Sequence, residues 1–451
     1  MFCCHKANSY DRIAAWVVSF HKRSNALHDS VGLRSSRGNI LPWNQEYESP
    51  NTCEMAESKL SLRVLQVSTM TFVDPRYYQS NELKLCRSLV KLGHEVTLLT
   101  STLSPRWAAH GEREVQKTSE EVDGFSVRRF AAGPEFGNVP LTPELFNGIL
   151  KLEWDWNILH THEIIAPSSF YSGLASCRKK RPYVVTQHDY EFGGTHGAKM
   201  FLHATHHCTL GRFTLSMASA VIGLSSAAVN FCLRFGASPN RTCVIPSSTD
   251  VTAFRPGQRS LLTEKWGIEG PIVLFVGRLD RNKAPYAVLE AYHKAISTVP
   301  SARLVMVGNG PEKDALLAVA KKLNLDHVYW IERVPREEMP RVYAGCELLV
   351  LPSLFEPFGN VVLEAMASGV PVVGSRIGGM KDTIIHGETG YLIKPGDAAE
   401  LAKYMITILQ DKDLQSEMSR AARQVAVERF DDMVVAKAVE SVYVNSLKDR
   451  S

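Results

Sequence analysis

Residues 352–373 read PSLFEPFGNVVLEAMASGVPVV, and this stretch decides the fold of the second half of the chain. A turn leads into an apolar helical run, and the closing Val-rich segment predicts a buried strand. Gly359 lets a ligand approach the turn closely, and Asn360 is a favourable N-cap for the helix. The first amides of that helix lack internal acceptors, so they predict an anion site. Glu356 and Glu364 flank this site, so the stretch suits a ligand with phosphate at its middle and hydroxyls at its ends.

Glu364 stands inside the otherwise apolar helical run 361–367. A buried carboxylate costs several kcal/mol, roughly, unless hydrogen-bond donors satisfy it. Vicinal ribose hydroxyls are suitable donors, and the helix N-terminus suits a diphosphate. The sequence therefore predicts a nucleotide-sugar site, in preference to an ordinary turn with surface glutamates.

Short apolar runs alternate with helical stretches on both sides of this segment. A helix is expected over residues 81–92, with Gly93 as its C-terminal cap. The alternation predicts two parallel, doubly wound α/β sheets with a ligand cleft between them. The expected strands are 63–68, 95–100, 157–160, 183–186, 220–223, 272–276, 303–307, 328–331, 348–351 and 370–373.

The domain boundaries follow from these runs and from a Pro-containing hinge over 246–271. We expect a disordered extension at 1–54, a Rossmann-like acceptor-binding domain at 55–250 and a Rossmann-like donor-binding domain at 251–430. The last segment, 431–451, is expected to be a helix that packs back on the first domain.

The composition is that of a soluble globular protein: 45% of the 451 residues are apolar and 22% are charged. The formal charge of +4 is too small to argue for nucleic acid binding. Nine dispersed cysteines without a C-x-x-C pair favour a cytoplasmic location. The longest apolar run near the start, 13–20, is too short to span a bilayer, although peripheral contact with the inner face of a membrane stays open.

Two further groups of residues follow expected strands, where open α/β sheets bind ligands. Gly277 opens the turn after one strand, and Arg278 and Lys283 supply cations for a diphosphate leaving group. In the first half, His162 and His188 stand at two strand ends. A histidine there could bind a sugar hydroxyl or transfer a proton, or simply be a satisfied polar residue at a turn.

Taken together, residues 62–447 resemble glycosyltransferase family 4, the retaining group 1 glycosyltransferases with the GT-B fold. The resemblance rests on Val276-Gly-Arg-Leu with Lys283, on Val307-Gly-Asn-Gly-Pro, on the opening stretch, and on the glycine pairs 378–379 and 387/390. It implies two Rossmann-like domains that face each other, with a C-terminal helix that crosses back. It also implies a hexosyltransferase that needs no metal or other cofactor.

The resemblance assigns roles residue by residue. His188, Glu356, Lys283 and Arg278 would be catalytic, with His188 near the anomeric carbon and Glu356 on the donor sugar. Glu364 would hold the ribose, and Ser80 and His162 would lie on the acceptor side. The full donor-binding set would be Gly277, Arg278, Lys283, Phe358, Gly359, Asn360, Val361, Glu364 and Val334.

The sequence departs from the family pattern at four places. No glycine pair follows the first strand, near residues 79–81, and residues 246–250 read PSSTD instead of PNGVD. A glycine expected near Glu332 is missing, and Asp382 stands where a glutamate is usual. These changes leave the expected diphosphate and ribose contacts intact. They affect the acceptor pocket, the binding of the nucleotide base and the geometry of the closed cleft.

We therefore expect a retaining transferase that moves a sugar from a UDP-, GDP- or ADP-linked donor to a hydroxyl of a glycan, glycolipid or small polyol. The alternative is a catalytically impaired nucleotide-sugar-binding protein, which the altered loop at 79–81 motivates. A nicotinamide dehydrogenase is excluded, because no G-x-G-x-x-G follows the first strand.

Overall fold

The computed structural model describes residues 61–68, 80–102, 118–133, 135–136, 139–140, 142–151, 154–190, 203 and 205–448. All of these belong to one compact unit, residues 46–451. The expected extension 1–54 lies outside the described residues.

The first sheet is parallel except for one edge hairpin, and its strand order is β10-β9-β8-β7-β1-β2-β4-β3. The order reverses at β1, which pairs with β7 on one side and β2 on the other. Ligands of open α/β sheets bind at such a reversal, beyond the carboxyl ends of the strands. The strands are β1 Arg63–Val67, β2 Glu95–Ser101, β3 Ser119–Val122, β4 Phe125–Phe130, β7 Ile158–His162, β8 Tyr183–Gln187, β9 Ala220–Gly223 and β10 Thr242–Val244.

The second sheet is parallel throughout, in the order β13-β12-β11-β14-β15-β16. Its order reverses at β11, which lies between β12 and β14. The strands are β11 Ile272–Val276, β12 Arg303–Val307, β13 Val328–Ile331, β14 Leu348–Leu351, β15 Val372–Ser375 and β16 Gly390–Ile393. Every expected strand is therefore confirmed within one or two residues of its predicted ends. The hairpin β3–β4, the edge strands β10 and β16, and the small antiparallel pair β5 Glu135–Phe136 and β6 Val139–Pro140 were not expected.

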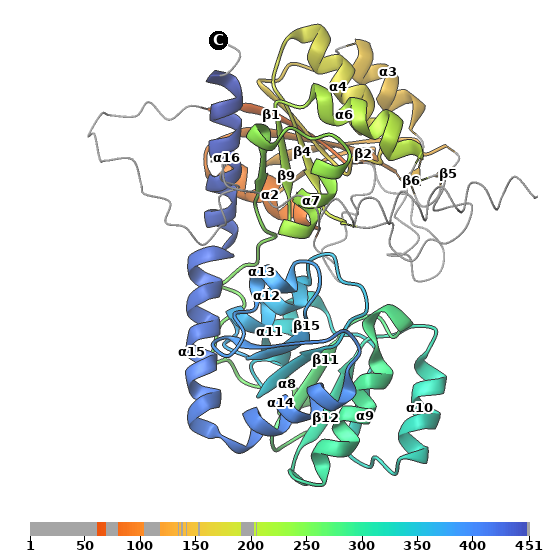
Figure 1. Ribbon diagram of the computed structural model, residues 1–451. Helices are drawn as coiled ribbons and strands as arrows, with labels where there is room; N and C mark the ends of the chain where they lie inside the picture. Colours follow the sequence, from red (N-terminus) through yellow and green to blue (C-terminus); the bar gives the residue numbers. More distant parts are fainter. Residues whose placement is uncertain are drawn as a thin grey trace, which may run out of the picture. The chain divides into compact units, whose positions relative to one another are not determined.

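Helices flank both sheets, as Figure 1 shows. Those of the first half are α2 Asn81–Lys91, α3 Pro143–Lys151, α4 Pro167–Lys179, the π-helix η1 His207–Gly211, α6 Arg212–Met217, α7 Ser226–Arg234 and the 3-10 turn η2 Pro239–Arg241. Those of the second half are α8 Leu261–Trp266, η3 Arg281–Lys283, α9 Pro285–Ile296, α10 Lys313–Lys322, η4 Arg336–Glu338, α11 Met339–Tyr343, α12 Asn360–Ala367, α13 Met380–Thr383 and α14 Ala398–Gln410.

Side chains of the first sheet alternate between two buried clusters. Val64 belongs to one cluster and Leu65 to the other, as expected for successive residues of a strand. The second sheet and its helices form a single larger cluster.

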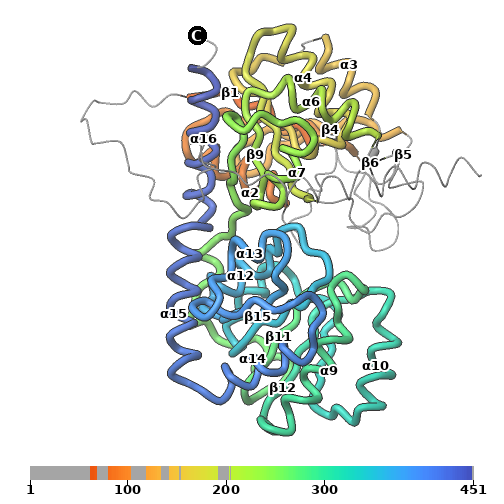
Figure 2. Tube along the Cα trace, in the orientation of Figure 1, coloured from red at the N-terminus to blue at the C-terminus, as the bar shows by residue number. Residues whose placement is uncertain are grey.

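The chain ends on two long helices, α15 Lys412–Arg429 and α16 Asp432–Lys448, which Figure 2 traces in blue. α15 packs on α12 of the second half. α16 packs on α2, and its Val435, Val439 and Tyr443 enter the core of the first sheet. The expected return of the C-terminal helix to the first domain is thus confirmed.

Candidate active site

The loops after β11 and β14 bring Lys283 and Glu356 together. Lys283 Nζ lies 2.5 Å from Glu356 Oε2, and Ser353 Oγ lies 3.4 Å from the same oxygen. Glu356 is only 6% exposed, so the ammonium group compensates a carboxylate with little access to water. Asp280 fixes the short turn η3 by accepting the backbone N–H of Lys283.

Arg278 follows β11 directly, but its side chain does not join this pair. The Arg278 side chain is 58% exposed, and its Nε lies 3.5 Å from Asp280 Oδ2. Gly277 lies against the neighbouring strand end: a Cβ atom on Gly308 would stand 1.9 Å from the carbonyl oxygen of Gly277. The close approach of two loops therefore requires a glycine at position 308. A bound ligand is not needed to explain this residue.

Glu364 is buried in α12 at 6% exposure, as the sequence predicts. Two donors from this chain satisfy it: Arg336 Nη1 at 2.6 Å and Tyr343 Oη at 2.9 Å. Burial and the Glu364 carboxylate raise the pKa of Tyr343 well above its usual value. Burial alone would lower the pKa of Arg336, but Glu364 outweighs it and the pKa is raised. Sequence reasoning missed both partners, although a carboxylate in an apolar helix signals that donors must exist.

The start of α12 differs from the prediction. Gly359, with a φ of 89°, is the N-cap, and Asn360 is the first helical residue, so the assignment of Asn360 as N-cap was wrong. The Asn360 side chain instead lies at a junction with the first half of the chain. Ser247 Oγ is 2.7 Å from Asn360 Oδ1 and 2.5 Å from Asn81 Oδ1. The sequence could not show this contact, because Ser247 and Asn81 lie far from Asn360 along the chain.

The remaining expected donor residues surround this turn. Phe358 is buried, Val361 is partly buried, and Val334 belongs to the core of the second half. The backbone of Gly378 presses on the turn, because a Cβ atom there would stand 1.9 Å from the carbonyl oxygen of Glu356. Packing alone therefore explains Gly378.

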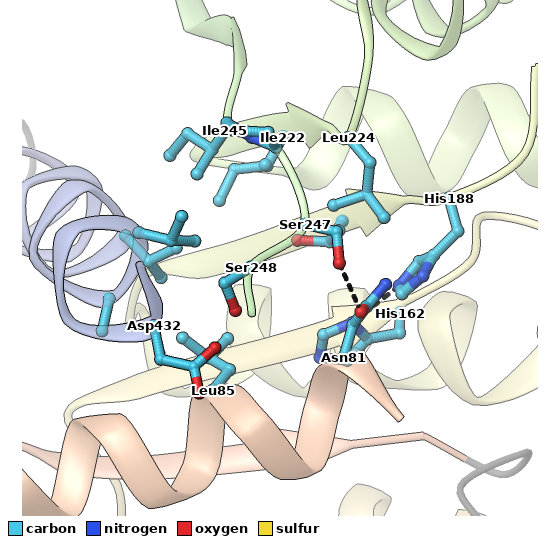
Figure 3. Close-up of a pocket in the computed structure, with 15 residues that line it drawn as sticks. Asn81, Leu85, His162, His188, Ile222, Leu224, Ile245, Ser247, Ser248 and Asp432 are labelled. Atoms are coloured by element: carbon cyan, nitrogen blue, oxygen red, sulfur yellow. Dashed lines mark hydrogen bonds between the residues drawn. The ribbon is translucent and has the colours of Figure 1, made fainter. Parts of the chain in front are cut away.

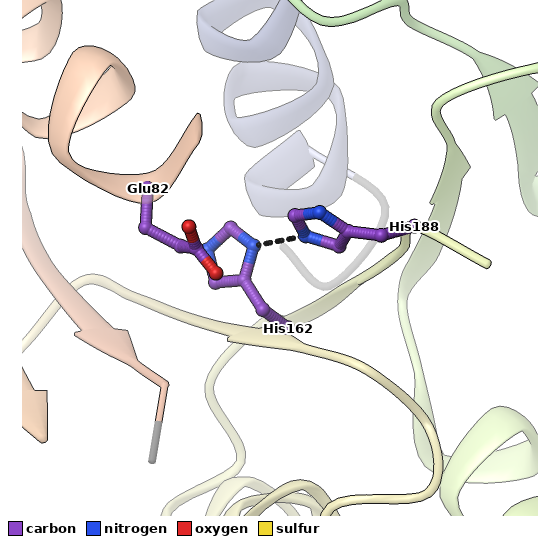
Figure 4. Close-up of side chains that lie close together, drawn as sticks. All are labelled: Glu82, His162 and His188. Atoms are coloured by element: carbon purple, nitrogen blue, oxygen red, sulfur yellow. Dashed lines mark hydrogen bonds between the residues drawn. The ribbon is translucent and has the colours of Figure 1, made fainter. Parts of the chain in front are cut away.

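In the first half, β7, β8 and α2 bring three titratable side chains together, as Figure 4 shows. His162 Nδ1 lies 3.1 Å from His188 Nε2, and Glu82 stands beside both rings. Burial and the neighbouring His188 lower the pKa of His162 to about 4, although Glu82 acts in the opposite direction. Burial alone would raise the pKa of Glu82, but His188 and His162, together with hydrogen bonds from its own backbone N–H and from Ser80, outweigh burial and lower the pKa.

The ligand atoms of Glu82, His162 and His188 all lie within 4.8 Å of one another, so their spacing would also suit a metal ion. The sequence predicts no metal, and that expectation remains a prediction. Glu82 was missed because only the fold places the second residue of α2 beside the ends of β7 and β8.

A small pocket opens beside these histidines (Figure 3). Asn81, His162, His188, Ser247 and Ser248 supply its polar wall, and Ile222, Leu224, Ile245 and side chains of α16 supply its apolar wall. Ser80 stands next to this wall and caps α2, because its Oγ accepts the backbone N–H of Leu83. Its assignment to the acceptor side remains a prediction. Gln79 lies outside the described residues.

Two of the unusual residues have clear structural roles. Asp382 accepts hydrogen bonds from the backbone N–H and the hydroxyl of Ser226, at 2.7 and 2.8 Å. Glu332 contacts Asn309 and Lys313 at the end of β13. Asp382 thus joins α13 to the start of α7. A glutamate has a longer side chain, so it would hold these two helices at a different distance from each other.

Comparison with known families identifies the class of protein to which the chain belongs. The model of group 1 glycosyl transferases matches residues 259–425, and the model of the glycosyl transferase 4-like domain matches residues 83–247. The chain belongs to the group 1 glycosyltransferases. Its two sheets are the two Rossmann-like domains of a GT-B glycosyltransferase.

Several curated glycosyltransferases are similar to this chain. The N-acetyl-alpha-D-glucosaminyl L-malate synthase of Bacillus anthracis is 30% identical over 242 residues, which are 53% of this chain and 62% of that enzyme. The glycogen synthase of Mycobacterium tuberculosis is 28% identical over 80% of this chain and 89% of the relative. The D-inositol 3-phosphate glycosyltransferase of Acidothermus cellulolyticus is 34% identical over 48% of this chain and 50% of the relative.

Solved structures support the same fold. The sucrose-phosphate synthase of Thermosynechococcus elongatus has a TM-score of 0.67 at 23% identity, over 86% of this chain and 99% of the other. HepE of Anabaena, solved with UDP, has a TM-score of 0.65 at 21% identity, over 86% and 100% of the two chains. No helix in the described ranges has both the length and the apolar composition needed to cross a membrane.

Proposed function

We propose that this glycosyltransferase moves a sugar from a nucleotide diphosphate donor to a hydroxyl acceptor, with retention of the anomeric configuration. The observation that carries the proposal is the ion pair between partly buried Lys283 and buried Glu356 beside the N-terminus of α12. An ammonium group and free helix amides stabilise a departing diphosphate, and a carboxylate binds sugar hydroxyls.

Glu364 suits the ribose even though Arg336 and Tyr343 already donate to it. A carboxylate offers about four lone-pair sites, and two of them remain for vicinal hydroxyls. The two protein donors hold the carboxylate in one orientation before the donor arrives. Such preorganisation lowers the free energy needed to order the site on binding.

The transfer itself would take place between the bound donor and the part of the first domain that carries His188. The bond between C1 of the sugar and the β-phosphate oxygen breaks, and the acceptor oxygen bonds to C1 on the same face. The acceptor proton passes to the departing phosphate oxygen, so no further reactant is needed. The resemblance to family 4, rather than a measured distance, supports retention.

The relatives support sugar transfer. The inositol phosphate relative is named a glycosyltransferase, and the other two are named as synthases of glycogen and of N-acetyl-alpha-D-glucosaminyl L-malate. Solved neighbours carry UDP, UDP-glucose or ADP. The donor base and the donor sugar are therefore best found by screening UDP-, GDP- and ADP-sugars for thermal stabilisation, because a ligand that binds the folded state raises its apparent stability.

The first test is donor turnover by Lys283→Ala and Glu364→Ala. Each variant should lose roughly a hundredfold or more in kcat/KM, because each removes a charged contact worth about 3 kcal/mol at a desolvated site. The matched controls are Lys294→Ala and Glu264→Ala, which remove surface charges from the same domain. Wild-type transfer by Lys283→Ala and Glu364→Ala would show the site assignment to be wrong.

The product decides the remaining points. NMR of the transferred sugar should show the anomeric configuration of the donor, and an inverted product would reject retention. The alternative function, a binder without transfer, is motivated by the altered loop at 79–81, where the family pattern has a glycine pair and where Asn81 instead contacts Ser247. Donor binding with neither transfer nor slow hydrolysis would favour that alternative.

A further inference from the structure

We propose that Tyr443 of the C-terminal helix and Gln66 of β1 are positioning residues for His188. Acting through His162, they keep a hydrogen on Nε2 of His188 and leave Nδ1 as the atom that meets substrate. The functional part of this inference rests on the proposed role of His188 in sugar transfer, whereas the hydrogen positions do not.

The chain of contacts begins on α16. Tyr443 Oη lies 2.7 Å from His160 Nδ1 and 3.0 Å from Gln66 Nε2. On the far side of its ring, His160 Nε2 lies 2.7 Å from Thr186 Oγ1. Tyr443 and His160 are completely buried, and Gln66 is as well, so no water competes for these groups.

The next contacts lead to the site. Gln66 Oε1 lies 2.9 Å from His162 Nε2, and His162 Nδ1 lies 3.1 Å from His188 Nε2. An amide oxygen only accepts, so His162 must carry its hydrogen on Nε2. Its Nδ1 is then a lone pair, and His188 must donate to it from Nε2. This holds whether His188 is neutral or protonated, so the hydrogen that is gained or lost sits on Nδ1.

The direction of the chain depends on the orientation of the Gln66 amide. A flipped amide would present its NH2 group to His162 Nε2, and every hydrogen along the chain would reverse. The contacts of the amide nitrogen favour the orientation described here. Gln66 Nε2 lies 3.0 Å from Tyr443 Oη and 3.2 Å from His160 Nδ1, so both hydrogens of the NH2 group face an acceptor. A flipped NH2 group would face only His162 Nε2 among the described residues, and its second hydrogen would be left unsatisfied.

Nδ1 of His188 has no hydrogen-bond partner among the residues that the structure describes, and His188 lines the pocket beside Asn81 and Ser247. When neutral, Nδ1 accepts a hydrogen bond from a substrate hydroxyl. When protonated, it donates one to a substrate oxygen. In the reversed tautomer, neutral His188 would carry its hydrogen on Nδ1 and could not accept a hydrogen bond there. Tyr443 and Gln66 disfavour that tautomer.

The test measures hydrogen positions directly, by NMR of the full chain with 15N-labelled histidine. Signals of His162 and His188 are assigned from His162→Gln and His188→Gln spectra. We expect the wild-type protein to show the Nε2–H form at both residues. A hydrogen on Nδ1 of His162 would overturn the proposal, and so would a neutral His188 with its hydrogen on Nδ1.

Tyr443→Phe removes a single oxygen and frees the Gln66 amide to flip. The Nδ1–H form should then appear at His162, and kcat should fall about 10- to 100-fold, the range found when outer partners of metal-bound histidines are removed. KM for the donor should stay within about twofold, because the donor lobe is untouched. Tyr292→Phe is the matched control: it also removes a buried, hydrogen-bonded hydroxyl, but from the second domain. Unchanged histidine signals in Tyr443→Phe would contradict the proposal.

A second variant covers the case in which Tyr443→Phe does not fold. Gln66→Met removes the acceptor of His162 Nε2, so the wild-type histidine signals should be lost, and their persistence would contradict the proposal. Titration with ZnCl2 provides the remaining check: tight binding that removes the His188 Nε2 hydrogen would show a metal site instead. If the signals are as expected but no sugar transfer occurs with any donor, the proposed function fails and the positioning chain stands.

Discussion

At the scale of single residues, the glycine at 378 shows how packing and the candidate site are joined. Its backbone has a φ of 46° and touches the turn that carries Glu356. A Cβ atom would also stand 2.8 Å from Cε1 of Tyr190, a ring that lies 5.2 Å from that of Phe355. No flexible side-chain end is available to yield at the nearest contact, because the obstructing atom is the carbonyl oxygen of Glu356.

Gly378→Ala should therefore displace the turn at Glu356. We expect the melting temperature to fall and the donor KM to rise at least severalfold. Gly387→Ala is the matched control, since Gly387 has a φ of 87° and nothing lies within 4 Å of its added Cβ atom. The control should show only the backbone penalty, about 1–2 kcal/mol, with donor KM unchanged. An equal effect of both substitutions on donor KM would contradict the contact argument.

At the scale of elements, the cap of α2 controls how the first domain presents Asn81 and Glu82. Ser80 Oγ accepts the N–H of Leu83 at 3.3 Å, and the next two residues both face the site. The family pattern has glycines in this neighbourhood, whereas this chain starts a helix with a serine cap. The Ser80 cap and the Asn81 contact therefore take the place of the glycines whose backbone approaches the donor phosphates in the family pattern.

Ser80→Ala should destabilise the protein by about 1 kcal/mol, the usual effect of losing an N-cap side chain. It should also lower transfer, because Asn81 and Glu82 move when the first turn frays. Ser80→Thr should restore both properties. Ser260→Ala removes the equivalent cap from α8 in the second domain, with Oγ 3.3 Å from the N–H of Thr263. Chemical unfolding and donor turnover should separate the two caps; a loss of turnover in Ser260→Ala as large as that in Ser80→Ala would refute the link.

At the scale of the whole molecule, local patterns predicted the elements but not the contacts between distant ones. Apolar runs located the strands, and the apolar neighbours of Glu364 predicted its burial. Nothing local indicates that Arg336 and Tyr343 satisfy this carboxylate. Gln66 and Tyr443 are 377 residues apart, and their hydrogen bond exists only because α16 returns to the first sheet. Contacts of this kind depend on tertiary packing, which a single sequence encodes without displaying.

Lys84 is a further product of that packing, and it makes stability depend on pH. It is 4% exposed on α2, and its Nζ donates to the carbonyl oxygen of Ser248 and lies 3.4 Å from Ser247 Oγ. Burial lowers its pKa from 10.5 to about 8, although Asp432 at the start of α16 acts in the opposite direction. Between these two values the unfolded chain binds more protons than the folded one. Stability contributed by this group therefore rises as the pH increases from about 8 to about 10.5.

The rise attributable to Lys84 should approach about 3 kcal/mol, since each pKa unit corresponds to about 1.4 kcal/mol. Buried tyrosines such as Tyr183, whose pKa is raised by burial, act in the opposite direction at high pH, so the absolute curve is not the test. The measurement is the difference in unfolding free energy between wild type and Lys84→Met at pH 7.5 and pH 10. That difference should shift in favour of the wild type as the pH rises. Lys91→Met, an exposed position on the same helix, should show no such shift. A constant difference for Lys84→Met would mean that the buried ammonium group titrates as it does in the unfolded chain.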